Sequence, residues 1–179
     1  GQASDVYLPL ADDGYSTTQS DAFVVGFSSA LTEAVVLLSL EHSAVGQLDA
    51  WLIAPDGTRV DLFQNIGGAG DDFVQVRFDD NAARSIAEVT AAAPPRGGYR
   101  PAEPLATLAG ISPNGTWTLV LRDEVRGDVG RLTDWSVRVT TADGRRATIR
   151  GGVPSVFTPQ NIAHYTLAVT PGDSRTGFD

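Results

Sequence analysis

Cysteine, methionine and lysine are all absent from the 179 residues of this chain. Without cysteine, no disulfide bond reports on the compartment, and the absence is compatible with a bacterial secreted protein. Without methionine, we expect the chain to begin after a processed or engineered N-terminus, with any targeting signal outside the chain. No apolar run has the length of a membrane-spanning helix. The chain nevertheless has the length of one domain, which would bury roughly 70% of the surface that its unfolded form exposes.

Positive charge is also scarce, because 13 arginines oppose 22 acidic residues and leave a net charge of -9. An acidic surface disfavours nucleic acids and anionic membranes, whose phosphates require clustered basic residues. We therefore expect no nucleic-acid partner and no insertion into a membrane. Of the acids, 17 are Asp and 5 are Glu, and Asp serves both as a turn residue and as a calcium ligand.

Helical periodicity is nearly absent as well, and strand-like runs recur at intervals of roughly ten residues. In residues 22–27, for example, Phe23, Val25 and Phe27 alternate with smaller residues. Such strands are expected at residues 4–10, 22–27, 34–40, 47–54, 59–63, 73–78, 145–150 and 162–169. Many short strands separated by turns predict an all-β fold, a jelly-roll-like β-sandwich.

The stretch from residue 113 to residue 140 alternates most clearly. Trp117 and Trp135 lie on the apolar faces of its two halves, so both tryptophans are predicted to point into the core. Between them, residues 123–134 hold too many acids and glycines to continue a strand. We predict a hairpin of two strands that presents an acidic loop.

Turn and capping residues predict two further local structures. The sequence Pro55-Asp56-Gly57-Thr58 is predicted to close a hairpin, because Pro presets one turn angle and Gly supplies a positive φ. Asp79, Asp80 and Asn81 are predicted to cap a short helix that ends near Val89, since their side-chain oxygens can accept the free amides of a first helical turn.

The chain has few residues that could act as a general base or an activated nucleophile. Only His42 and His164 are available as general bases, and the chain has no G-x-S-x-G nucleophile motif. His42 follows an apolar strand, so we expect it to be packed rather than catalytic. Most carboxylates fall in turns, which disfavours the paired acids of a glycosidase, and two distant histidines do not form a zinc site. We therefore predict no intrinsic enzymatic activity. Hydrolysis of a peptide or ester substrate that is lost on His42→Ala would contradict this prediction.

Calcium is the one cofactor for which the sequence supplies ligands, because it binds six to eight oxygens that clustered Asp and loop carbonyls can provide. The two candidate clusters are Asp71 and Asp72 with Asp79 and Asp80, and Asp123 with Asp128. No EF-hand spacing is present. The alternative interpretation, that these residues are solvated turn acids and a helix cap, stays open.

Several spaced sequence blocks point to a family. They are HSAVGQLDAWLIAPDGTRVDLF at residues 42–63, GGAGD at 67–71, FDD at 78–80, GYRP at 98–101, PL at 104–105, NGTWTL at 114–119 and GDVG with WSV at 127–137. In this order they resemble the P domain of the proprotein convertases, also called the P/Homo B domain. The resemblance covers about residues 5–142. Where that family commonly has Gly-Asp-Leu, this chain has Gly46-Gln47-Leu48.

The resemblance implies a jelly-roll β-sandwich that follows the subtilisin-like catalytic domain of kexin-like proteases and is needed for their folding and stability. It also implies that the domain carries no catalytic residues of its own. We expect this domain at residues 1–142. Residues 143–179 would then be a C-terminal extension, with one or two strands packed on the same domain and a polar tail.

We therefore predict a non-catalytic accessory domain of a secreted or cell-surface, bacterial, subtilisin-like serine protease. Its partner would be the catalytic domain of the same parent chain or another extracellular protein, and it would stabilise or regulate that catalytic domain by docking an apolar patch against it. The alternative is a free-standing extracellular jelly roll that binds an adhesion partner or a ligand. The residues that precede Gly1 in the parent protein would separate the two functions.

Overall fold

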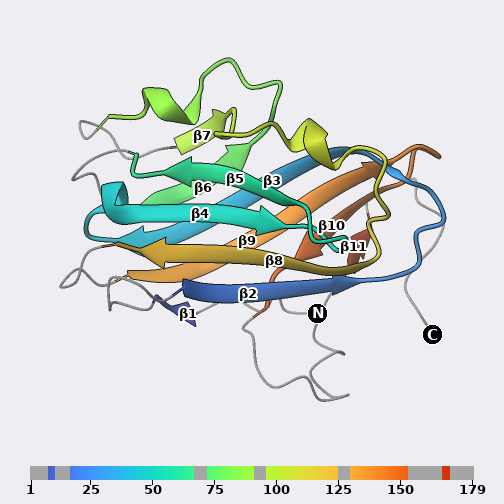
Figure 1. Cartoon of the computed structure of the whole chain (residues 1–179), viewed down its shortest axis with the longest axis horizontal. Helices are drawn as coiled ribbons and strands as arrows, with labels where there is room; N and C mark the ends of the chain where they lie inside the picture. Colours follow the sequence, from blue (N-terminus) through green and yellow to red (C-terminus); the bar gives the residue numbers. More distant parts are fainter. Residues whose placement is uncertain are drawn as a thin grey trace.

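Two β-sheets packed face to face make up the fold (Figure 1). The computed structural model describes residues 8–10, 17–66, 72–90, 96–124, 130–152 and 167–169. Apart from strands, these residues form only three short 3-10 helices, η1 (Val45–Gln47), η2 (Ile86–Glu88) and η3 (Leu105–Leu108). The predicted all-β sandwich is confirmed.

The large sheet has seven strands. Its spatial order is β11 (Leu167–Val169), β10 (Arg146–Arg150), β9 (Gly130–Thr141), β3 (Leu31–His42), β6 (Phe73–Phe78) and β7 (Arg96–Tyr99), and β1 (Leu8–Pro9) pairs with β9. The small sheet has four strands in the order β2 (Thr17–Val24), β8 (Gly115–Asp123), β4 (Leu48–Ile53) and β5 (Arg59–Gln64). Apart from β6 and β7, which are parallel, the paired strands are antiparallel. In Figure 1 the small sheet lies in front of the large one.

The core lies between the sheets, and its two largest fully buried side chains are tryptophans. Trp117 of β8 and Trp135 of β9 are fully buried, as their alternation predicted. Each indole N–H also has an acceptor, since Trp117 Nε1 donates to the Pro113 carbonyl at 3.0 Å and Trp135 Nε1 donates to Ser20 Oγ at 2.7 Å. The polar ends of both rings are therefore satisfied inside the core.

The predicted hairpin at residues 113–140 is wrong. β8 belongs to the small sheet and β9 to the large sheet, so the two tryptophans enter the core from opposite sheets. Alternation shows that each strand has one apolar face, but the same pattern fits a hairpin and a pair of strands in opposing sheets. Here the chain between Asp123 and Gly130 connects one sheet to the other.

The alternation predicted for residues 22–27 is also wrong. β2 runs from Thr17 to Val24 and buries Ala22 and Val24, whereas Val25 is exposed. Pairing with β8 places Ala22 opposite the core tryptophan Trp117. Pairing with β8 therefore determines which face of β2 is buried, and the larger side chain of Phe23 points outward.

The turns and caps are partly as expected. Ala54 and Thr58 close the predicted hairpin between β4 and β5 with a backbone hydrogen bond of 2.8 Å, and Gly57 has a φ of +89°. The predicted helix ending near Val89 is reduced to η2, which Ser85 and Glu88 cap in a reciprocal capping box. The prediction that Asp79, Asp80 and Asn81 cap this helix is wrong, because a closer Ser occupies the N-cap position.

β10 extends the large sheet beyond residue 142. It pairs with β9 through five residue pairs, from Arg146 opposite Thr140 to Arg150 opposite Ser136. After β10 the chain crosses toward the small sheet, where the amide of Gly152 donates to the Asp21 carbonyl at 2.9 Å. The chain after Thr140 therefore ties the two sheets together at one side. The boundary predicted between residues 142 and 143 stays a prediction.

Candidate functional site

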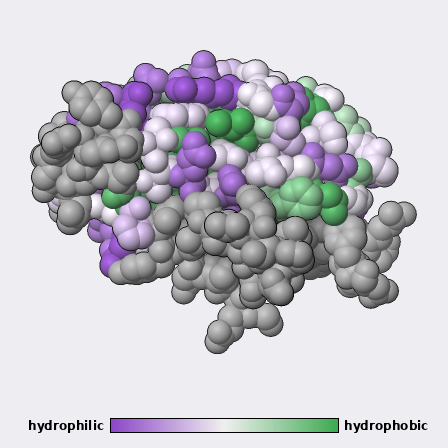
Figure 2. All heavy atoms as spheres, turned by 60° about the horizontal axis from the view of Figure 1, so that its bottom comes forward, coloured by the Kyte–Doolittle hydropathy of each residue, from purple (hydrophilic) through white to green (hydrophobic). Residues whose placement is uncertain are grey.

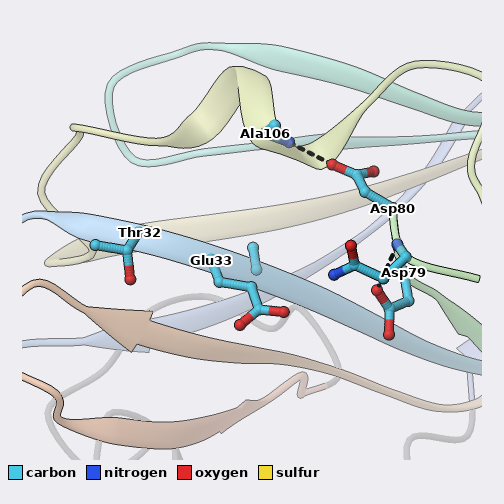
Figure 3. A pocket seen from close by; sticks show the side chains of 7 residues that line it. Thr32, Glu33, Asp79, Asp80 and Ala106 are labelled. Atoms are coloured by element: carbon cyan, nitrogen blue, oxygen red, sulfur yellow. Dashed lines mark hydrogen bonds between the residues drawn. The ribbon is translucent and has the colours of Figure 1, made fainter.

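Of the six predicted calcium ligands, Asp72, Asp79, Asp80 and Asp123 are described, and Asp71 and Asp128 lie outside the described residues. Asp80 accepts two backbone hydrogen bonds, from the Leu105 amide at 2.9 Å and from the Ala106 amide at 2.7 Å. Both of its carboxylate oxygens are thus used to cap the first turn of η3 (Figure 3). Asp80 is a helix cap, although for a different helix from the one predicted.

Asp79 lies beside a shallow acidic hollow of about 420 Å³. One of its oxygens accepts the Asn81 amide at 2.9 Å, and the other lies 3.5 Å from Arg77 Nη2. Figure 3 shows Asp80 turned toward η3, whereas the carboxylates of Asp79 and Glu33 point the other way. Glu33, on β3, was not a candidate because only the packing of η3 and β6 around β3 brings it here.

His42 joins the two remaining candidates, Asp72 and Asp123. The His42 amide donates to Asp72 Oδ1 at 2.9 Å, and His42 Nε2 lies 2.9 Å from Asp123 Oδ2. His42 Nδ1 accepts the Ala44 amide at 3.0 Å. Since a backbone amide can only donate, the ring proton is on Nε2 and is donated to Asp123. The two carboxylates therefore bind His42 at the ends of β3 and β8.

This histidine cannot act on a substrate from outside. The side chains of His42 and Asp123 are 0% and 1% exposed, and both ring nitrogens are hydrogen-bonded. A Cβ added at Gly130 would lie 2.3 Å from His42 Cδ2, so the backbone of β9 closes over the ring. The predicted packing of His42 is confirmed. His164 lies outside the described residues.

Within the described ranges, no group of three or more His, Asp or Glu side chains is arranged to hold a metal ion. The ligands that the sequence offered are separated into a helix cap at Asp80, a turn at Asp79 and a buried pair at Asp123. Calcium binding stays a prediction, and it now depends chiefly on Asp71 and Asp128.

A polar cluster on the small sheet was not predicted from the sequence. Arg122 Nη2 donates to Asp49 Oδ2 at 2.5 Å and to Glu124 Oε1 at 3.0 Å. Burial raises the pKa of Asp49, and the hydrogen bond from Asn65 lowers the pKa of Glu124. The guanidinium lies between the two carboxylates and pairs with both. Cross-strand pairing of Asp49 with Arg122 is the only signal that could have revealed this cluster.

Trp51, on the same face of the small sheet, is not accessible for stacking against a sugar ring. The Arg59 guanidinium lies 4.1 Å from the centre of its ring and the Arg122 guanidinium 5.8 Å. With only 9% of the residue exposed, the indole is covered by its own arginines. The small sheet therefore gives no support to a carbohydrate-binding function through this tryptophan.

The predicted apolar docking patch has no counterpart in the part of the chain that is described. There, the large hydrophobic side chains that are exposed are Val25, at 38%, and Val74, at 41%, and they belong to different ends of the sandwich. Figure 2 shows hydrophobic residues in small separate groups on the face that it draws. None of the described helices has the length and apolar character needed to cross a membrane.

The proprotein convertase P-domain family model matches residues 31–139. Leupeptin-inactivating enzyme 1 of Streptomyces exfoliatus is 28% identical over 114 residues, which are 64% of this chain and 19% of that protein. The chain thus spans about a fifth of this curated relative.

Two solved structures are also similar. A serine protease of Aeromonas sobria aligns with a TM-score of 0.44 and 24% identity over 78% of this chain and 25% of the protease chain. The complex of the Aeromonas sobria serine protease with its chaperone aligns with a TM-score of 0.40 and 25% identity. The alignment covers 84% of this chain and 22% of the chain in that complex.

Proposed function

We propose that this chain, which belongs to the proprotein convertase P-domain family, is a non-catalytic accessory domain of a subtilisin-like serine protease. The family match from residue 31 to residue 139 carries the proposal, because it spans the sandwich from β3 to β9. The partner is the catalytic domain of the same polypeptide, which this domain stabilises or regulates. The parent protein is secreted or displayed at a bacterial cell surface.

The buried state of His42 supports the non-catalytic part of the proposal. A general base must come within hydrogen-bonding reach of the proton it removes, and His42 is enclosed and bound on both ring nitrogens. The chain has no G-x-S-x-G nucleophile motif, and the described side chains include no metal cluster, which also supports this part of the proposal. Calcium remains a proposed structural ion rather than a catalytic one.

Deletion of this chain from its parent protein tests the proposal. We expect the protease to be inactivated faster at raised temperature without the domain, because a partner that binds the folded state stabilises it. The measurement is the half-life of peptidase activity with and without the domain. An unchanged half-life, or hydrolysis by the isolated chain that disappears on His42→Ala, would contradict the proposed function.

A further inference from the structure

The outward face of the large sheet carries a row of residues that the core does not use. Strand pairing places Arg150 of β10 beside Ser136 of β9, Ser136 beside Leu37 of β3, and Leu37 beside Arg77 of β6. In the next row, Arg138 lies between Thr148 and Val35. We call this surface the arginine face and define it by Val35, Leu37, Arg77, Ser136, Arg138 and Arg150.

The middle of the arginine face is apolar or small, and its periphery is charged. Val35 and Ser136 are 8% and 5% exposed, Leu37 is partly exposed, and the Arg77 side chain is 47% exposed. Protein interfaces likewise combine a core depleted of charge with an overall enrichment in arginine. The face is therefore suited to a protein partner, although its described residues form no continuous apolar patch.

A hollow of about 560 Å³ opens at one side of this face. Leu37, Arg77, Gly97, Gly98 and Asp134 are among the residues that line it. It exists because β7 contributes two glycines where side chains would otherwise stand, and a Cβ at Gly98 would lie 3.3 Å from Arg77 Nη2. A projecting side chain of a partner could enter this space beside the Arg77 guanidinium.

Several arginines of the two sheets pair with a carboxylate of this chain, but Arg138 and Arg150 have no such ion pair among the described residues. On the small sheet, Arg59 and Arg122 each have a carboxylate partner, at 2.7 and 2.5 Å. On the large sheet, Arg77 lies 3.5 Å from Asp79 and Arg131 pairs with Glu41, whereas no ion pair joins Arg138 or Arg150 to a carboxylate of the described residues. In a chain with a net charge of -9, two cations on one face without a carboxylate partner among the described residues favour a partner that supplies carboxylates.

We propose that the arginine face docks the protease domain of the same polypeptide, on a surface whose carboxylates meet Arg138 and Arg150. This inference rests on the proposed function and adds the surface and the chemistry of the contact. A second copy of the chain is disfavoured as the occupant, because joining this face to an acidic surface elsewhere on the molecule is a head-to-tail contact, which gives open assemblies unless its rotation closes.

The test compares two double variants of the parent protein that have the same net charge. R138Q/R150Q removes two positive charges from the arginine face. T17E/Q19E adds two negative charges to the outer face of the small sheet, where both residues are exposed. We expect the half-life of peptidase activity at raised temperature to fall about five- to tenfold in R138Q/R150Q and to stay unchanged in the control.

Three further measurements separate docking from folding. Protection of the β3 and β9 amides from hydrogen exchange should be the same in R138Q/R150Q as in the unaltered protein, because neither arginine contributes to the core. R138K/R150K, which keeps the charge and loses the bidentate fork, should retain an intermediate half-life. Molar salt should shorten the half-life of the unaltered protein toward that of R138Q/R150Q, since salt screens surface charge.

The outcomes distinguish this inference from the proposed function. If deletion of the whole domain shortens the half-life and R138Q/R150Q does not, the arginine face is not the docking surface and the proposed function stands. If deletion has no effect, both are overturned. If R138Q/R150Q leaves the half-life unchanged but dissociates a dimer of the parent protein in light scattering, the occupant is a second copy and the inference is wrong.

Discussion

At the scale of single residues, Arg122 holds two carboxylates together on a sheet surface. Asp49 is buried and Glu124 is at the edge of the cluster, so the two acids respond to pH in opposite directions. Burial disfavours the charged form of Asp49, whereas the hydrogen bond from Asn65 favours the charged form of Glu124. The cluster therefore makes the stability of the chain depend on pH. A substitution at either acid would reveal the contribution of that residue.

The first prediction concerns Asp49→Asn. Because the folded pKa of Asp49 is raised, its contribution to stability is fully present below its unfolded pKa and is lost as pH rises above about 4. The unaltered chain should lose stability relative to Asp49→Asn between pH 4 and pH 7. Urea unfolding of both proteins at each pH measures the difference.

Asp56 provides the matched control for this measurement. The hydrogen bond from the Thr58 amide lowers the Asp56 pKa, so its contribution is present above the unfolded pKa and lost as pH falls. The difference curve for Asp56→Asn should slope the opposite way. Parallel, flat curves for the two variants would show that neither carboxyl is perturbed as described.

The second prediction concerns Gly151, which lies against the indole of Trp135. An added Cβ would lie 1.9 Å from Trp135 Nε1, so either the ring or the chain after β10 must move. We expect Gly151→Ala to lower the free energy of unfolding by about 1–3 kcal/mol, the usual cost of overpacking. Gly144→Asn is the control, because that site is open and Asn tolerates its φ of +83°. Equal stability of the two variants in urea would rule out the steric argument.

At the scale of elements, the short helices depend on side chains from distant segments. η3 has no side-chain cap of its own, and Asp80 supplies one from the turn after β6. This contact holds η3 beside β3, where the backbone of Gly110 also donates to the Leu31 carbonyl at 2.7 Å. A carboxylate that looked like a metal ligand thus positions a helix against the large sheet.

The third prediction follows from this cap. Asp80→Ala should reduce the free energy of unfolding by about 1–2 kcal/mol, since two amides lose their acceptor. Asp80→Asn should lie between the two, because its amide group keeps one acceptor oxygen. Denaturant titration of the three proteins gives the order. If Asp80→Ala matches the unaltered chain, water replaces the cap at no cost and Asp80 has no structural role.

At the scale of the whole molecule, the fourth prediction concerns calcium binding by the acidic segments that contain Asp71 and Asp128. If Asp71 and Asp128 help to form a calcium site, millimolar calcium should raise the melting temperature of the chain, because an ion that binds only the folded state stabilises it. Magnesium, which demands a smaller octahedral site, should have a lesser effect. Differential scanning fluorimetry measures both.

Substitutions of the proposed ligands would show where the calcium ion binds. Asp71→Asn and Asp128→Asn should each reduce the calcium-dependent rise in melting temperature, while Asp56→Asn, in a turn between β4 and β5, should leave it intact. The absence of any rise at millimolar calcium would eliminate calcium as a cofactor of this domain.

Much of the architecture was predictable because it depends on residues close together in the chain. Alternation identified both core tryptophans and most strands, and Pro55 with Gly57 identified the β4–β5 hairpin. The predicted capping of η2 failed since Ser85, adjacent to the helix, was a better cap than Asp79 or Asp80. The candidate site was harder to predict, because the partners of Asp80, Asp123 and Arg122 come from other elements.

The sequence by itself determined the all-β class, the inward faces of β8 and β9 and the lack of a nucleophile motif, because these depend on periodicity and composition. Only the tertiary structure decided that β8 and β9 belong to opposite sheets, that Asp123 binds His42, and that arginines gather on one outer face. Strand order and cross-strand register bring distant residues together, and a local pattern is compatible with more than one such pairing. The physical reason is that alternation specifies which face is buried, whereas pairing specifies what buries it.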